Sequence, residues 1–158
     1  MIGIIGFGRF GKLTARYLAE DFEVYVFNRT DRSAEIKKAG ARNASLKTVC
    51  QQKIVILCVP ISTFKEVLVE IGPLLKENSV VVDVCSVKVY PTQWMKASLP
   101  ETVSILATHP IFGPDSASDS LKDRKIFLSP IRISKKQYQK IKSYLASKEL
   151  VLIESTPE

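Results

Sequence analysis

The sequence has 158 residues, of which 46% are hydrophobic, and carries a formal net charge of +7 at pH 7. This composition excludes a disordered chain and a disulfide-stapled miniprotein, and it predicts one globular domain over residues 1–158. The apolar runs are shorter than the roughly 20 residues that span a bilayer, and the first core strand directly follows Met1, so we expect no membrane partner, no leader peptide and a cytoplasmic location.

The first 30 residues are expected to form a strand, a glycine turn, a helix and a second strand. Residues 2–5 are apolar, a helical spacing of apolar residues follows the turn, and the second strand is expected at EVYVF, residues 23–27. The turn matches GxGxxG, whose glycines allow a tight turn, close approach of a pyrophosphate and close helix packing. Because it lies between a strand and a helix, we predict a dinucleotide site rather than a turn without a ligand. The predicted cofactor-binding residues of this turn are Gly6, Phe7, Gly8, Arg9, Phe10 and Gly11.

The residues after the second strand indicate which dinucleotide is bound. An Asp or Glu there would accept hydrogen bonds from the ribose 2′-hydroxyl of NAD, whereas this chain has an amide, a hydroxyl and two guanidinium groups, which suit a 2′-phosphate. These predicted cofactor-binding residues are Asn28, Arg29, Thr30 and Arg32. We therefore expect NADP rather than NAD. The alternative, which Asp31 keeps open, is that the arginines only solvate the start of a helix.

Later segments repeat the alternation of strand and helix. The next helix is expected over residues 31–38, capped by Thr30 or Asp31 and followed by Gly40. Another helix is expected over residues 64–71, where Gly72 and Pro73 end it. Apolar strands are expected at residues 53–59, 79–84, 102–108, 125–131 and 150–154. Strands that are apolar on both faces and alternate with helices predict an α/β fold with a doubly wound, mostly parallel sheet, the NAD(P)-binding Rossmann fold, with extra C-terminal strands and a helix.

The segment KKQYQKIK at 135–142 contributes much of the positive charge. Tyr138, Ile141 and Leu145 recur between its lysines at spacings of three and seven, which predicts an amphipathic helix with a solvated basic face. This explanation is preferred to a phosphate-binding surface, so we expect no nucleic-acid partner.

The ends of two central strands carry further candidate site residues, because open α/β sheets bind ligands at the carboxyl ends of their strands. The segment CVPIST at 58–63 is expected to line the cofactor groove through Cys58, Val59, Pro60 and Thr63. In DVCSVK at 83–88, Ser86 and Lys88 are candidates to reach the nicotinamide or an anionic substrate. A structural pair between Asp83 and Lys88 is the alternative role for that lysine.

Two residue types limit the remaining chemistry. The three cysteines, Cys50, Cys58 and Cys85, are an odd number without a CxxC spacing, so we expect reduced thiols and no metal site. The single histidine, His109, follows the apolar run 102–108 and precedes a loop stiffened by prolines. Taken alone, it is either a catalytic base or a polar residue at the end of a strand.

Five segments, GFGRFG, NRT, CVP, DVCSVKVYP and ATHPIFGPDS, occur in this order along the chain. Their order and spacing resemble those of the prephenate and arogenate dehydrogenases of tyrosine biosynthesis, and SVK and THPIFGP are the most specific of them. The resemblance covers nearly the whole chain but only the N-terminal nucleotide-binding domain of that family.

The resemblance implies an oxidative decarboxylation of arogenate or prephenate, for which the residues after the second strand predict NADP as the cofactor. In such a reaction hydride leaves the ring carbon that carries the hydroxyl group, carbon dioxide departs and the ring becomes aromatic. By the same resemblance, His109 bonds that hydroxyl and assists removal of its proton, and Ser86 assists at the same hydroxyl beside the nicotinamide. A neutral imidazole, with an ordinary pKa of about 6.5, suits this role at neutral pH.

The family's C-terminal helical domain, which holds the substrate carboxylates and forms the dimer interface, is absent from these 158 residues. We therefore expect the isolated chain to bind NADP and to turn substrate over slowly or not at all unless a homodimer mate or a separate helical-domain chain completes it. Two alternatives are an NADP-binding module without catalysis and another NADP-dependent oxidoreductase of this Rossmann type, as in the pyrroline-carboxylate reductases and β-hydroxyacid dehydrogenases.

Overall fold

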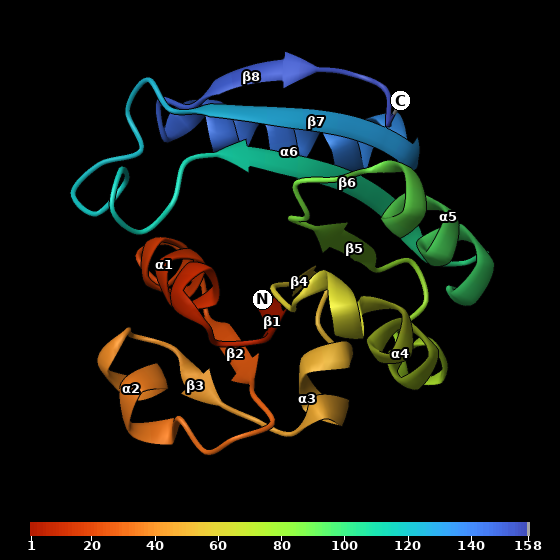
Figure 1. Ribbon diagram of the computed structural model, residues 1–158, viewed down its shortest axis with the longest axis horizontal. Helices are drawn as coiled ribbons and strands as arrows, with labels where there is room; N and C mark the ends of the chain where they lie inside the picture. The colour runs from red at the N-terminus through yellow and green to blue at the C-terminus, as the bar shows by residue number, and fades with distance from the viewer. Residues whose placement is uncertain (158) are drawn as a thin grey trace.

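A sheet of eight strands in the order β3-β2-β1-β4-β5-β6-β7-β8 forms the centre of this computed structural model, which describes residues 1–157 (Figure 1). The expected domain range, 1–158, ends one residue outside this part. The strands are β1 (Ile2–Ile5), β2 (Val24–Phe27), β3 (Arg42–Asn43), β4 (Ile54–Leu57), β5 (Val80–Asp83), β6 (Ser104–Ile111), β7 (Lys125–Arg132) and β8 (Val151–Glu154). Only the pair β6–β7 is antiparallel among the described strands, which confirms the mostly parallel sheet.

Helices cover both faces of this sheet. They are α1 (Arg9–Leu18), α2 (Ser33–Lys38), α3 (Leu46–Cys50), α4 (Ile61–Ile71), α5 (Val89–Ser98) and α6 (Lys135–Ser147), with a 3₁₀ turn at Gly72–Leu74. One apolar core lies against α3, α4 and α5, and the other against α1, α2 and α6. Because both faces are covered, the inner strands β1 and β5 are buried along their whole length, as parallel strands of this class are.

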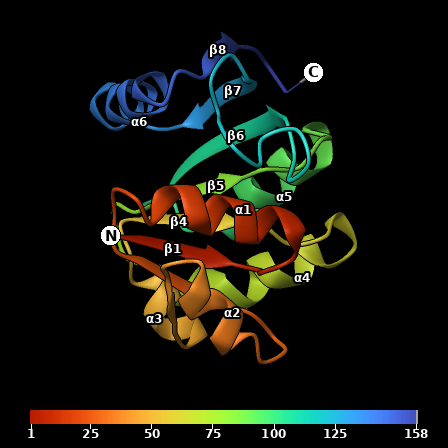
Figure 2. The ribbon, with the colours of Figure 1, turned by 90° about the vertical axis from the view of Figure 1, so that its left-hand side faces the viewer.

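The two ends of the sheet have different cover. Helix α6 and strand β8 lie at the β7 end, away from α2 and α3 at the other (Figure 2). Helix α6 begins with a capping box in which the Ser134 hydroxyl accepts from the Gln137 N–H and the Gln137 side chain accepts from the Ser134 N–H. Its apolar side, including Tyr138 and Ile141, packs toward the sheet, so the predicted amphipathic helix is confirmed and extends to Ser147.

Three elements were not predicted: β3, α3 and α5. The first two have two and five residues, too few to show a periodic pattern. Helix α5 contains Pro91, which normally indicates a break, but Pro91 lies in the first turn, where its missing N–H would have had no helical acceptor. The helix expected over 31–38 begins two residues later, at Ser33, and its N-cap residue is Arg32 without a side-chain cap bond, so neither Thr30 nor Asp31 caps it. The Asp31 side chain instead accepts from the Ser33 N–H at the start of the helix, and Gly40 follows the helix with φ +89°, as expected.

The chain order of the strands creates a crevice beside β1. From β1 the chain builds β2 and β3 on one side, and it then crosses to β4 and β5 on the other. The loops after β1 and β4 therefore diverge to opposite faces at their carboxyl ends, and such a switch point is where open α/β sheets bind ligands. Among residues 1–157, no helix is long and apolar enough to cross a membrane.

Candidate functional site

A cavity of about 580 Å³ lies at this switch point. It is lined by thirteen of the fifteen predicted cofactor-binding residues: Gly6, Phe7, Gly8, Arg9, Phe10, Gly11, Asn28, Arg29, Arg32, Cys58, Val59, Pro60 and Thr63. Thr30 and Ser86 are not among its lining residues. The structure thus brings together the glycine turn, the loop after β2 and the segment after β4, which are far apart in the sequence. It adds residues that sequence reasoning missed, including Leu46, Val67 and Glu70.

The glycine turn has room for a ligand only at its second glycine. Gly6 has φ +101°, and a Cβ there would lie 2.2 Å from the Cys58 carbonyl oxygen. A Cβ on Gly11 would lie 2.4 Å from the Gly6 oxygen, so α1 packs directly on the turn. A Cβ on Gly8, in contrast, would have no heavy atom within 4 Å. The first and third glycines are therefore needed by the protein's own packing, and the second leaves open space at the cavity.

The N-terminus of α1 faces this cavity and suits an anion. Gly8 and Arg9, at its first turn, line the cavity. Within the described chain, no side chain caps this helix and its first turn holds no acidic residue. Its free N–H groups and partial positive charge are thus available to a diphosphate, so the residues present fit a dinucleotide cofactor.

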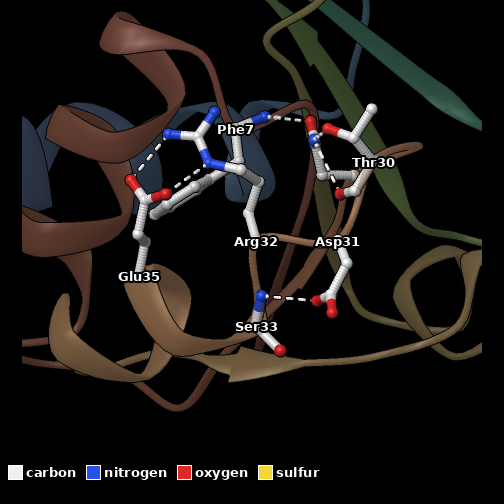
Figure 3. Close-up of polar contacts among 7 residues, drawn as sticks. Phe7, Thr30, Asp31, Arg32, Ser33 and Glu35 are labelled. Atoms are coloured by element: carbon white, nitrogen blue, oxygen red, sulfur yellow. Dashed lines mark hydrogen bonds and ion pairs between the residues drawn. The ribbon is translucent and has the colours of Figure 1, made fainter.

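Asn28 holds the glycine turn against the loop after β2. Its Oδ1 accepts from the Phe7 N–H at 2.8 Å, and its Nδ2 donates to the Thr30 carbonyl and hydroxyl oxygens, each at 3.0 Å (Figure 3). The amide that was expected to bind the 2′-phosphate thus bonds to the protein itself, and Thr30 is its partner. These contacts fix the two loops that bear the glycines and the arginines.

Each of the three arginines that line the cavity has a carboxylate partner. Arg9 pairs with Asp115 at 2.8 Å, and Arg29 lies 3.6 Å from Glu70. Arg32 donates two hydrogen bonds of 2.7 Å to Glu35, and its guanidinium lies 5.7 Å from the centre of the Phe7 ring (Figure 3). Hydrogen bonding to Arg32 lowers the pKa of Glu35 below its ordinary value. The positive charge of the cavity is therefore already balanced by acidic side chains.

The loop after β5 is anchored by a buried ion pair. Lys88 bonds to Asp83, and its Nζ also donates to the Thr108 carbonyl at 2.5 Å. Asp83 in turn accepts from the Thr108 N–H and the Cys85 N–H, both at 3.2 Å. Burial raises the pKa of Asp83, against the opposing effects of Lys88 and these N–H groups. The structure therefore gives Lys88 the structural role that was the alternative at the sequence level.

His109 lies inside a strand, not after it. We expected a strand over 102–108, but β6 runs to Ile111, with His109 paired to Phe127 and Pro110 to Ile126 of β7. The parallel ladder with β5 ends at Ala107, so this extension has a partner on one side only, where a proline is tolerated. The imidazole is half-buried, and burial, aided by the charge of Lys88 and opposed by Asp83, lowers its pKa.

Ser86 lies at the same edge of the sheet. Ser86 is exposed in the bend three residues after Asp83, the last residue of β5. Asp83 pairs with Ala107 of the neighbouring strand β6, and His109 lies two residues after Ala107. The two predicted catalytic residues therefore extend from adjacent strands beyond the same rung of the ladder. A serine hydroxyl and a neutral imidazole placed this way provide a hydrogen-bonding group and a proton acceptor.

The loop after His109 folds back onto α1 (Figure 1). The Tyr17 hydroxyl donates to the carbonyl of Ala117, which is fully buried, and the Arg16 guanidinium donates to the Ser118 carbonyl. No pattern in the sequence indicated these two contacts, because they join segments about a hundred residues apart and both end on backbone carbonyls.

Cysteine and metal chemistry are not features of the described site. Burial raises the pKa of Cys58 to about 12 and that of Cys85 to about 11, so both thiols stay protonated near neutral pH and are poor nucleophiles. In residues 1–157 all three cysteines are free, and no cluster of His, Cys, Asp or Glu is arranged to hold a metal ion.

Known proteins resemble this chain along nearly all of its length. The family model for "Prephenate dehydrogenase, nucleotide-binding domain" matches residues 15–154. A "Probable arogenate/prephenate dehydrogenase" of Methanocaldococcus jannaschii is 30% identical over 155 residues, 94% of this chain. "Arogenate dehydrogenase 1, chloroplastic" of Arabidopsis thaliana is 32% identical over 137 residues, 84% of this chain.

Solved structures give the same fold. Prephenate dehydrogenase from Aquifex aeolicus, in complex with hydroxyphenyl propionate and NAD⁺, superposes with a TM-score of 0.82 at 21% identity, over 99% of this chain and 59% of that one. The chain spans only 34% of the M. jannaschii protein and 21% of the A. thaliana protein. The similarity therefore covers one domain of proteins that are considerably longer.

Proposed function

Because this chain belongs to the prephenate dehydrogenase family and matches its nucleotide-binding domain, we propose that it forms the NADP-binding, catalytic-histidine half of an enzyme that oxidatively decarboxylates arogenate or prephenate. The main support is that the glycine turn, the arginine loop and the β4 end line one cavity, while His109 and Ser86 extend from the next two strands.

The chain's own residues would hold the cofactor in a defined orientation. The N-terminus of α1 and the open space at Gly8 receive the diphosphate. Arg29 and Arg32 receive the 2′-phosphate, which distinguishes NADP from NAD. A related structure contains NAD⁺, so the choice of NADP for this chain rests on these two arginines. When bound, the oxidised nicotinamide accepts hydride from the substrate carbon that carries the hydroxyl group.

His109 takes the proton of that hydroxyl. Its lowered pKa keeps the imidazole neutral at pH 7, so it can accept a proton without first losing one. Ser86 hydrogen-bonds the same oxygen and holds it at the edge of the sheet. Lys88 and Asp83 do not touch the substrate in this scheme, because both are engaged in the buried pair.

An exposed apolar rim supports a further, helical part that completes the substrate site. Ile61, Val87, Val89, Tyr90 and Ile111 are large apolar side chains with at least two fifths of their surface exposed. All lie just beyond the carboxyl ends of β4 and β5 or at the end of β6, around the proposed catalytic residues. We propose that a helical domain outside residues 1–158 covers this rim, and that these residues alone turn substrate over slowly or not at all.

The decisive experiment is a calorimetric titration of the chain with NADP⁺ and NAD⁺, for the native sequence and for Arg29→Asp. Loss of the guanidinium and gain of a carboxylate should weaken NADP⁺ binding by about 100-fold and NAD⁺ binding by about threefold or less, because only NADP⁺ carries the 2′-phosphate. Equal losses for both cofactors would refute the phosphate assignment.

A module that binds NADP without catalysis is the second candidate, because thirteen predicted cofactor-binding residues line one cavity, whereas His109 and Ser86 are not among its lining residues. Reduced-nicotinamide absorbance with arogenate or prephenate separates the two. Turnover that appears only when a helical-domain chain is added supports the enzyme half, and absence of turnover with every such partner supports the module. Rapid turnover by the isolated chain would contradict the need for a partner.

A further inference from the structure

Among residues 1–157, Glu70 on α4 is the one carboxylate that lines the cofactor cavity. Its Oε2 lies 3.6 Å from Nη2 of Arg29, the arginine that follows β2. We propose that Glu70 sets how strongly this cavity discriminates between NADP and NAD, by competing with the 2′-phosphate for Arg29 and by repelling that phosphate. The inference rests on the proposed function only in placing the 2′-phosphate at the arginine loop.

The pair between Arg29 and Glu70 is loose enough to be displaced. Its separation of 3.6 Å is longer than a hydrogen bond, and the two side chains are 63% and 54% exposed. Exposed pairs of this kind contribute little free energy, so a phosphate group can take over the guanidinium at small cost. The carboxylate nevertheless remains at the wall of the cavity, where its negative charge acts against an added phosphate.

The second arginine of the loop shows a different arrangement. Glu35 holds Arg32 through two hydrogen bonds of 2.7 Å within the first turn of α2, and Glu35 is not among the residues that line the cavity. This pairing orients the Arg32 guanidinium over the Phe7 ring (Figure 3). Glu35 therefore positions its arginine from outside the cavity, whereas Glu70 acts from inside it.

The two cofactors should respond differently to Glu70. NAD has a 2′-hydroxyl, so the Arg29–Glu70 pair can stay intact beside it. NADP brings a phosphate of nearly two negative charges, which must separate that pair and then lie near an unpaired carboxylate. Glu70 consequently weakens the binding of NADP but not that of NAD. The preference for NADP over NAD is therefore smaller than Arg29 and Arg32 would produce without Glu70.

The test is a calorimetric titration of Glu70→Gln with NADP⁺ and NAD⁺ at low and high salt. Glutamine keeps the size of the side chain and removes its charge. The NADP⁺ affinity should rise by about 3- to 10-fold, the NAD⁺ affinity should change by less than about twofold, and the gain should shrink at high salt. Glu66→Gln is the matched control, because Glu66 is exposed one turn earlier on α4 and outside the cavity lining, and it should change neither affinity by more than about twofold.

Three outcomes would overturn the inference: an unchanged or lower NADP⁺ affinity in Glu70→Gln, an equal gain for both cofactors, or an equal NADP⁺ gain in the Glu66→Gln control. Failure of the proposed function is seen separately, in the native chain and in Arg29→Asp. If Arg29→Asp weakens NADP⁺ selectively but Glu70→Gln leaves the NADP⁺ affinity unchanged, the phosphate site stands and only the role of Glu70 fails. If Arg29→Asp weakens both cofactors equally, the phosphate assignment fails, and the role of Glu70 fails with it. If neither cofactor binds the native chain, both proposals fail.

Discussion

Replacing Lys88 by methionine tests whether its pair with Asp83 is structural. The side chains of Asp83 and Lys88 are 0% and 11% exposed, and the pair also bonds the backbone of Thr108 next to His109. Removing one partner of a buried pair leaves an uncompensated buried charge and costs about 3–5 kcal/mol. Because Lys88 retains some exposure, we expect the lower end, about 3 kcal/mol, which is a large part of the stability of a domain of this size.

The loss should depend on pH. Without Lys88, the folded-state pKa of Asp83, already raised by burial, rises further above its unfolded value of about 3.9. A carboxyl group with a raised folded pKa contributes stability that is complete below the unfolded pKa and is lost as pH rises through the folded pKa. Lys88→Met should therefore be closer to the native chain in stability at about pH 5 than at about pH 7.5.

Urea denaturation followed by circular dichroism at the two pH values measures this effect. The double variant Asp83→Asn, Lys88→Met should recover stability to within about 1 kcal/mol of the native chain, because no buried charge remains. Lys136→Met, an exposed lysine on α6, is the control and should change the free energy of unfolding by less than about 0.5 kcal/mol. A loss below about 1 kcal/mol in Lys88→Met, or a loss that does not change with pH, would refute the buried-pair argument.

The remaining predictions concern the glycine turn and the histidine. Gly8→Ala should keep the free energy of unfolding within about 1 kcal/mol of the native value, because its Cβ meets no atom within 4 Å, yet weaken NADP⁺ binding at least about tenfold. Gly11→Ala should lower the free energy of unfolding by more than about 2 kcal/mol, because its Cβ would lie 2.4 Å from the Gly6 oxygen. Urea denaturation measures the stability of both variants and calorimetric titration measures their NADP⁺ affinity; equal effects of the two substitutions would contradict this prediction. In an NMR titration the His109 pKa should lie below 6.5 and should rise in Lys88→Met, which removes a positive charge that lowers it; a native pKa above 6.5 would disprove the assigned environment.

The parallel sheet could be predicted because each of its strands and helices leaves a hydrophobic pattern within one short segment of the sequence. Strands buried on both faces appear as unbroken apolar runs such as 53–59, and amphipathic helices separate them. Helix α5 could not be predicted in this way, because Pro91 masks a helix start and its apolar residues do not form one regular stripe. The extension of β6 through Pro110 depends on pairing with β7, a contact between segments that the order of residues alone does not reveal.

The site could be predicted where one segment supplies its own ligand groups. The glycine turn combines its backbone, its helix start and its open position within six residues, so the motif is sufficient to locate it. The acidic partners of the arginines are a different case. Glu70 reaches Arg29 from a helix forty residues away, and only the fold places that carboxylate in the cavity. Sequence reasoning therefore found the positive groups and missed the charge that balances them.

Contacts within this domain hold the backbone on either side of His109. Before it, Thr108 is held to Asp83 and Lys88 by buried hydrogen bonds. After it, the loop is held to α1 by the bond from Tyr17 to Ala117, and α1 is the helix whose N-terminus faces the cofactor cavity. A domain that completes the substrate site therefore need not shape the segment that carries the proposed proton acceptor, because the backbone before and after His109 is already held within this domain. In the proposed enzyme, such a domain would supply the group that holds the substrate against His109.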